Sequence, residues 1–272
     1  MDKSRHCNYK SPMIKKLTAR LLAAMVLLYL TMTALAADTG TSAVGAAALD
    51  GDAILRAVDR KMRHESYEMY RKLINVKPDG SRREFVMYTI AKGRDRVANQ
   101  FLAPAYDQGR ALLRLGENMW LYLPDVKLQP IRVASLHSVV GGIFNNWDLM
   151  HLELADEYDV DSVQEEGDSY LLSLKAKTRS TPYDHLTVWA GRDSLLLERI
   201  EAYATSGLLI KSLDFKDTKD FGDGIVRPAV IETKSPLWQG YKAVMVFAQM
   251  RKREFPDEVF SLSYMSRIGD LR

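Results

Sequence analysis

From Ser66 onward, short stretches rich in hydrophobic residues are separated by turn signals. Pro78, Asp79 and Gly80 stand between the first two stretches, and tight turns favour these residue types. The predicted strands are residues 67–76, 82–91, 111–115, 119–123, 158–163, 169–177, 186–190, 195–204, 208–215, 226–234 and 241–251. Strands joined mainly by short turns favour an antiparallel meander over βαβ units.

Many of these strands carry apolar residues on both faces. Trp120 and Tyr122 share one face of their strand, and leucines occupy its other face. In the last strand, Met245 and Phe247 share one face, and strict alternation puts Met250 on the opposite face. A sheet with one face in water would alternate apolar and polar residues. Two apolar faces indicate either a strand covered on both sides or a strand that lines an apolar cavity, and the sequence leaves both open.

Before the strands, the apolar spacing predicts one amphipathic helix with a polar side that includes Asp59. Asp50 or Asp52 can cap the start of this helix. Its apolar stripe comprises Ile54, Leu55, Val58 and Met62. A helix of this kind is expected to cover the sheet, and a helix lying on a membrane surface is the alternative.

Residues 134–152 break the strand pattern, because they are apolar but irregular. Gly141 and Gly142 suggest a hinge, since glycine adopts backbone angles that other residues resist. Either asparagine at 145 and 146 can cap a short helix that begins near Trp147. We expect this segment to fold over the sheet and to form a second cover beside the N-terminal helix.

The N-terminus has the features of a secretory signal. Residues 14–20 are basic, residues 21–30 are apolar, and Ala34-Leu35-Ala36 gives the small-x-small pattern at which signal peptidase cuts. A membrane anchor is the alternative, but a span needs about 20 apolar residues. The sequence predicts a signal peptide over residues 1–36, cleaved near Ala36, and a periplasmic protein. Met1 or Met13 is the true start.

The remaining chain is expected to comprise a flexible tether over residues 37–48 and a single β domain over residues 49–272. Removing residues 1–36 removes six basic residues and one acidic residue, which changes the net charge from +3 to −2. A protein without a basic surplus is a poor partner for nucleic acid. The only cysteine is Cys7, so the mature chain would hold no disulfide and no thiol nucleophile.

No catalytic signature is present: HExxH, GxSxG and GxxxxGK[ST] are all missing from the sequence. His151 and Glu153, with Asp156 nearby, form one weak pair of candidate metal ligands, and polar residues at a strand start explain them as well. The sequence therefore predicts no catalytic residue, no metal and no cofactor.

Large apolar side chains are the remaining candidates for a site. They either fill the core or line an apolar pocket, because both are built from the same residue types. The candidates for an apolar cavity and its lid are Trp120, Tyr122, Ile143, Phe144, Trp147, Leu149, Trp189, Met245 and Phe247.

Four blocks of the sequence resemble the LolA-like family of bacterial outer-membrane lipoprotein-sorting proteins, over roughly residues 50–268. They are Asp52–Met62, Arg110–Pro124, Ser135–Leu149 and Arg227–Phe260. The resemblance implies a mainly β (α+β) fold, in which a strongly curved antiparallel sheet forms an incomplete barrel covered by helices. It also implies an apolar cavity between the sheet and its cover.

Members of this family carry acyl chains of lipoproteins or of free lipids through the periplasm. An exposed acyl chain costs about 0.8 kcal/mol per CH₂ in water, so a carrier needs a cavity and a lid but no covalent chemistry. The resemblance implies transient membrane contact and an inner-membrane exporter as a partner. A lipid- or protein-sensing module of an exporter or envelope-stress system is the alternative, and an enzyme of unrecognised type is a third.

Overall fold

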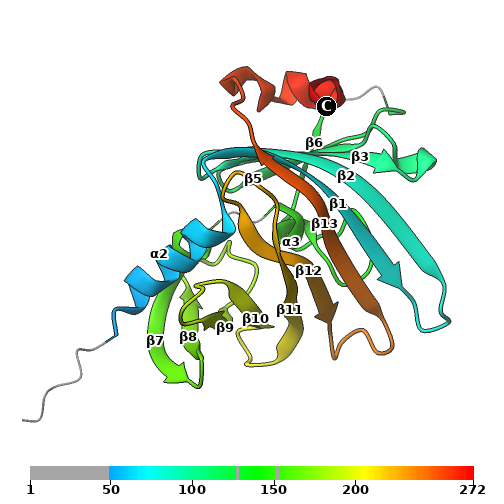
Figure 1. Cartoon of the computed structure of the whole chain (residues 1–272). Coiled ribbons are helices and arrows are strands. Elements are labelled where there is room, and N and C mark those ends of the chain that lie inside the picture. Colours follow the sequence, from blue (N-terminus) through cyan, green and yellow to red (C-terminus); the bar gives the residue numbers. More distant parts are fainter. Residues whose placement is uncertain (1–48, 127–128, 151–152) are drawn as a thin grey trace, which may run out of the picture. The chain divides into compact units, whose positions relative to one another are not determined.

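The structure is a computed structural model that describes residues 49–126, 129–150 and 153–272, so the predicted signal peptide and tether lie outside the described residues. One antiparallel sheet of 13 strands dominates the described part of the chain (Figure 1). The strands are β1 (Ser66–Val76), β2 (Arg82–Lys92), β3 (Arg96–Ala103), β4 (Ala111–Leu115), β5 (Asn118–Tyr122), β6 (Ile131–Val133), β7 (Tyr158–Glu166), β8 (Ser169–Ala176), β9 (His185–Gly191), β10 (Leu197–Tyr203), β11 (Leu209–Asp220), β12 (Val226–Lys234) and β13 (Lys242–Lys252).

The strand order confirms the predicted antiparallel meander. It consists of two meanders, β1–β6 and β7–β13, which meet at the centre of the sheet. The order is β6-β5-β4-β3-β2-β1-β13-β12-β11-β10-β9-β8-β7, so the first strand pairs with the last. The two edge strands, β6 and β7, are consecutive in the chain but do not pair with each other. The sheet is therefore open, and Figure 1 shows that it is curved, as expected. The chain between β6 and β7 must cross from one edge of the sheet to the other.

Two strands escaped the sequence analysis. In β3, the buried polar residues Asn99 and Gln100 interrupt the apolar pattern. Strand β6 has only three residues, and two of them are exposed. The alternation assigned to the last strand was also wrong at Met250. The β1–β13 pairing shifts at Tyr70, so Ala248 is an extra residue and Met250 joins the same core cluster as Phe247.

In the described residues, three short α-helices and three 3₁₀ segments accompany the sheet. They are α2 (Gly51–Met62), α3 (Asn146–Met150), α4 (Leu154–Glu157), η1 (Ala105–Asp107), η2 (Asp257–Val259) and η3 (Leu262–Leu271). Asp50 caps α2 by accepting a hydrogen bond from the backbone N–H of Ala53 at 2.9 Å. The helix lies against α4, β7 and β12. Asp59 does not lie on the exposed side of α2, as the sequence suggested, but is buried.

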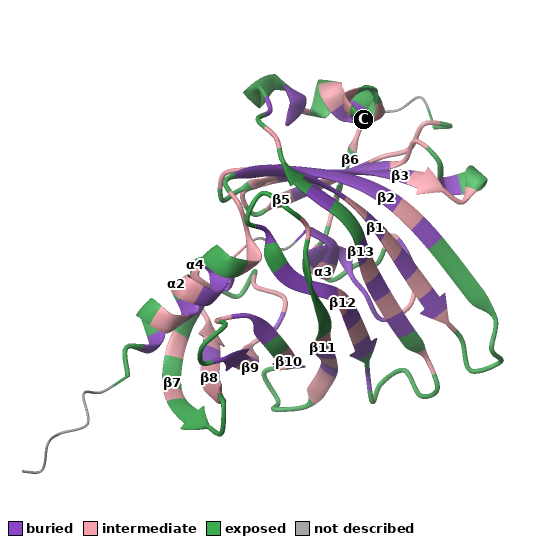
Figure 2. Ribbon diagram, in the orientation of Figure 1, coloured by how far each residue is buried: buried purple, intermediate pink, exposed green. Residues whose placement is uncertain are grey.

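Buried apolar side chains form two clusters on opposite faces of the sheet, and Figure 2 shows where buried residues lie along its strands. The larger one, on the inner face, contains residues from both meanders, from α2 and from α3. The smaller one, on the outer face, joins β2–β5 to the C-terminal segment through residues such as Phe255, Phe260 and Met265. Strands of the first meander are thus covered on both sides, which explains their two apolar faces.

Candidate functional site

Residues 134–150, which we call the covering segment, follow β6 and carry α3 over the inner face of the sheet. Asn145 and Asp148 fix the start of α3 by a reciprocal capping box. The side-chain oxygen of Asn145 accepts from the N–H of Asp148 at 3.0 Å, and the Asp148 carboxylate accepts from the N–H of Asn145 at 2.8 Å. The structure thus confirms the predicted second cover and selects Asn145 over Asn146 as its cap.

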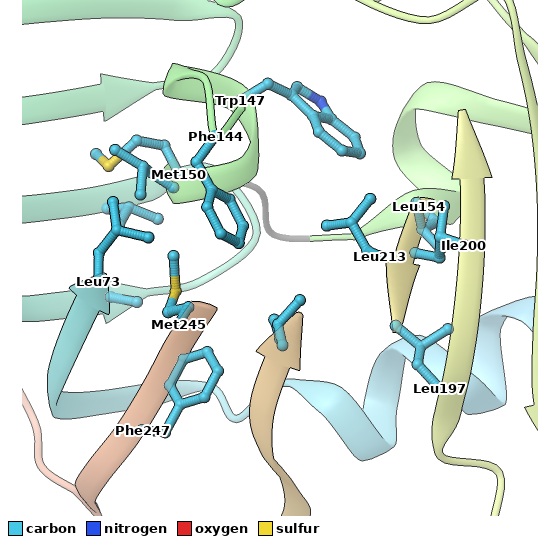
Figure 3. Packing of buried hydrophobic residues seen from close by; sticks show 14 of the residues in the cluster. Leu73, Phe144, Trp147, Met150, Leu154, Leu197, Ile200, Leu213, Met245 and Phe247 are labelled. Carbon is cyan, nitrogen blue, oxygen red and sulfur yellow. The ribbon is translucent and has the colours of Figure 1, made fainter. Parts of the chain in front are cut away.

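A cavity of about 100 Å³ lies between the covering segment and the inner face. Phe144 points from the covering segment toward Met245 on β13, and Leu213 and Ile200 lie on the other side of this space (Figure 3). The lining residues are Asp59, Met62, Arg63, Tyr67, Met69, Arg71, Val97, Phe144, Trp147, Asp148, Leu149, Leu154, Leu197, Ile200, Leu213, Phe215, Arg227, Ile231, Met245 and Phe247. Most are apolar, which suits an apolar ligand.

Five of the nine candidate residues line this cavity, and they come from two distant segments. The covering segment contributes Phe144, Trp147 and Leu149, and β13 contributes Met245 and Phe247. All five are less than a tenth exposed. Ile143 is buried without lining the cavity, and its carbonyl oxygen accepts a hydrogen bond from Lys211 instead.

The structure does not bring the other three candidates, Trp120, Tyr122 and Trp189, to the cavity. Trp120 and Tyr122 pack against the outer cluster. The half-buried Trp189 stacks with Arg199, whose guanidinium carbon lies 5.7 Å from the ring centre. On β5 and β9 the aromatic residues occupy the outer face, while smaller aliphatic side chains point inward. Ring size alone could not distinguish the two faces.

A buried ion pair anchors the covering segment to β11. The ammonium group of Lys211 lies 2.6 Å from the carboxylate of Asp148, and both side chains are at most 4% exposed. Lys211 also donates to the carbonyl of Ile143 at 2.7 Å. The hydroxyl of Tyr183 accepts from Asn145 at 2.7 Å, and burial raises the pKa of this tyrosine well above its usual value. Breaking one partner of such a pair would leave a buried charge uncompensated.

The predicted glycine hinge has the backbone geometry that requires glycine. Gly141 and Gly142 have φ angles of 65° and 81°, in the left-handed region that other residues disfavour. The side-chain amide of Asn75 on β1 donates to the carbonyls of Val140 and Gly141, at 3.1 and 2.8 Å. The hinge is therefore hydrogen-bonded to the centre of the sheet.

Two arginines hold the end of α3 through backbone carbonyls. Arg71 on β1 donates to the carbonyl of Leu149 at 2.8 Å, and Arg114 on β4 donates to that of Met150 at 3.3 Å. Arg114 also pairs with Glu157. Burial lowers the pKa of Arg71 to about 10. These anchors could not be predicted from the sequence, because a charged residue inside an apolar strand gives no sign of what it contacts.

Asp59 links α2 to α4 beside the cavity. Its two carboxylate oxygens accept from the backbone N–H groups of Leu154 and Ala155, at 3.0 and 2.8 Å. Burial raises the pKa of Asp59 from 3.8 to about 6, against the opposing effect of these two hydrogen bonds. The N-terminal helix is therefore attached to the chain that leaves the covering segment.

A second, more polar groove of about 300 Å³ is lined in part by Ser135 and Trp147 of the covering segment. Its charged residues are largely paired: Arg94 with Glu153 and Asp156, and Arg114 with Glu157. Among residues 49–126, 129–150 and 153–272, no group of three or more His, Cys, Asp or Glu side chains could hold a metal ion. Within the same ranges, no helix is long and apolar enough to cross a bilayer.

Comparisons with known proteins agree with this architecture. A family model described as "-like: Uncharacterized protein" matches residues 93–267, which is more than half of the chain. A LolA superfamily protein from Nitrosomonas europaea has a similar structure, with a TM-score of 0.72 and 24% identity over 80% of this chain and 100% of its own. No curated protein matches the sequence.

Two further solved structures share the fold. A DUF1329 family protein from Desulfovibrio piger has a TM-score of 0.70 and 22% identity, covering 79% of this chain and 97% of its own. A domain from Vibrio parahaemolyticus, assigned to outer membrane lipoprotein sorting, has a TM-score of 0.69 and 18% identity, covering 80% and 98%. At these identities the likeness describes the fold.

Proposed function

This chain has a LolA-like fold and belongs to the family whose model matches residues 93–267, and from that premise we propose that it carries acyl chains through the periplasm. The cargo is a lipoprotein or a lipid, moved between the inner and the outer membrane. The assignment of the related Vibrio domain to lipoprotein sorting supports the proposal. Export relies on the signal peptide predicted for residues 1–36.

The observation that carries the proposal is an apolar cavity closed by a segment that polar contacts hold in place. The cavity measures about 100 Å³, whereas pockets for organic ligands usually hold about 300–1,000 Å³. A lipid can enter only if the covering segment moves away from the inner face. We propose that Phe144, Trp147 and Leu149 close the cavity, and that an acyl chain displaces them and packs against Met245 and Phe247.

The energies of opening and loading are of similar size. Exposing each large apolar side chain of the covering segment costs about 1.5–3 kcal/mol, and each broken neutral hydrogen bond costs about 0.5–1.5 kcal/mol. An acyl chain of about 15 methylenes gains roughly 12 kcal/mol on leaving water. The cost of opening is therefore of the same order as the cost of leaving the chain in water, from which the closed carrier shields it. A membrane or an inner-membrane exporter would donate the chain by transient contact.

Native mass spectrometry of the protein isolated from its own envelope tests this proposal. We expect mass additions that dissociate as lipids or acylated peptides. Leu213→Trp fills the cavity and should abolish these additions, whereas the control Leu208→Trp alters a side chain that is 52% exposed and should leave them intact. A bare polypeptide mass for the wild type, together with no uptake of a fluorescent acyl probe, would contradict a carrier function.

A further inference from the structure

Five charged side chains line the cavity, and three of them have committed partners. Asp59 accepts two backbone N–H groups, Asp148 pairs with a buried lysine, and Arg63 pairs with a glutamate at 2.5 Å. The other two are Arg71 and Arg227, which are 3% and 8% exposed. Unlike Arg63, neither of these arginines forms an ion pair with an acidic side chain in the described part of the chain.

The guanidinium groups of both arginines are only partly satisfied. Arg71 donates to the carbonyl of Leu149 at 2.8 Å, and more weakly to Oδ1 of Asn99 at 3.3 Å and to the thioether of Met245 at 3.7 Å. Arg227 donates to the carbonyl of Met62 at 2.8 Å. The Nε atom of each is buried and has no hydrogen-bond partner. No carboxylate in the described part of the chain forms an ion pair with either of them. Burying an uncompensated charge costs free energy, so an anionic ligand that pairs with these arginines would stabilise the site.

Both arginines are neighbours of Phe247 in the cavity lining. Arg71 lies opposite Phe247 in the β1–β13 pairing, and the guanidinium carbon of Arg227 lies 4.6 Å from the centre of the Phe247 ring. Burial lowers the pKa of each, and the charge of Arg227 further lowers that of Arg71. An anion between them would relieve this repulsion. Apolar residues such as Leu197, Ile200 and Leu213 line the rest of the cavity.

We propose that the cargo is an anionic amphiphile, whose carboxylate or phosphate headgroup pairs with Arg71 and Arg227 while its chain occupies the apolar lining. This inference rests on the proposed carrier function and narrows it. Chains attached to a lipoprotein through ester or amide bonds bring no such anion into the cavity. The site therefore favours a free acidic lipid.

A matched series of ligands tests the headgroup. Hexadecanoic acid, hexadecyl phosphate and hexadecanol have the same chain and are compared by competition with a fluorescent acyl probe at about pH 8, where a carboxylate is ionised. We expect both acids to bind about tenfold more tightly than the alcohol, or better, because hydrogen bonds to charged groups are the strong ones. Inorganic phosphate alone should not displace the probe.

Substitutions of the two arginines distinguish loss of the positive charge from loss of folding. Arg227→Gln and Arg71→Gln should each reduce the ratio of acid affinity to alcohol affinity about tenfold. Urea unfolding of each variant checks its folding, because both side chains also line the cavity. Arg227→Lys should keep most of the preference. The control Arg60→Gln changes an exposed arginine of α2 and should have no effect.

The outcomes distinguish the two proposals. Equal binding of acid and alcohol by the wild type would overturn the headgroup inference and leave the carrier function standing. Failure to bind any of the three amphiphiles would overturn both. Displacement of the probe by inorganic phosphate alone would indicate a site for small anions and overturn the proposal that the ligand is an amphiphile.

Discussion

Asp59 joins α2 to α4 through a single ionisable carboxyl group. It shares a helical face with Leu55 and Met62, so its carboxylate points inward with them and meets the first backbone N–H groups of α4. Burial holds its pKa near 6, compared with 3.8 for an ordinary aspartate. The folded protein therefore binds this proton more tightly than the unfolded chain does.

The raised pKa predicts a pH dependence of stability with a definite sign. Between about pH 4 and pH 6 the folded state holds the proton and the unfolded state releases it, so this contribution to stability is present at low pH and is lost as the pH rises through about 6. The shift corresponds to roughly 3 kcal/mol. Asp59→Asn cannot titrate, so wild-type stability should fall relative to this variant as the pH rises from about 4 to about 7.

Urea unfolding of both proteins across this pH range measures the effect. Asp52→Asn provides the control, because Asp52 lies in the same helix and is exposed. A stability difference between wild type and Asp59→Asn that stays constant with pH would show that Asp59 keeps an ordinary pKa in the folded protein.

Single residues differ in how far their sequence context reveals their role. Asn145 and the glycine pair were predictable, because caps and positive φ angles are local features of the chain. Arg71 was not, since its partners are a carbonyl on the covering segment, the side chain of Asn99 and the thioether of Met245, all distant in sequence. Residues that act through long-range contacts leave no local pattern.

At the scale of elements, the covering segment owes its position to topology. It leaves one edge strand of the sheet and leads through α4 to the other, so it must pass over the open inner face. Its polar contacts with the sheet are made largely by backbone carbonyls and by one ion pair. A segment held at both ends by the chain itself can open without leaving the protein.

A disulfide across the hinge tests whether this segment is the gate. A Cβ atom at Gly142 would lie 3.1 Å from Cγ of Asn75, so cysteines at these positions bring their Cβ atoms near the separation of about 3.5–4.5 Å that a disulfide needs. In an Asn75→Cys, Gly142→Cys protein with Cys7 replaced by serine, we expect oxidation to slow uptake of an acyl probe at least tenfold.

Reduction of the same protein is the internal control and should restore uptake. The cysteine at 142 is strained because of its positive φ angle, at a cost of about 1–3 kcal/mol, and this strain is common to both redox states. Equal uptake rates before and after reduction would mean that lipid enters without movement of the hinge.

At the scale of the whole sheet, the sequence predicted the meander but not the pairing of its first and last strands in the middle of the sheet. Turn signals identify neighbouring strands, whereas the pairing of β1 with β13 joins the two ends of the fold and has no local signature. The C-terminal cover was missed for a similar reason. Its residues around Phe255 and Met265 follow no long helical period, and only the outer face of β2–β5 shows what they bury.

The two faces of the sheet should respond differently to loss of an aromatic ring. Phe247 lines the inner cavity, and half-buried Trp120 packs under the C-terminal segment on the outer face. Trp120→Ala should lower the free energy of unfolding by about 2–3 kcal/mol through lost apolar contact and leave probe affinity unchanged. Phe247→Ala should change probe affinity about tenfold or more, because it removes a lining side chain on which Arg227 stacks. Unfolding and binding measurements on both variants decide the matter. If Trp120→Ala altered affinity as strongly as Phe247→Ala, the outer face would belong to the ligand site and a cavity on the inner face alone would not account for binding.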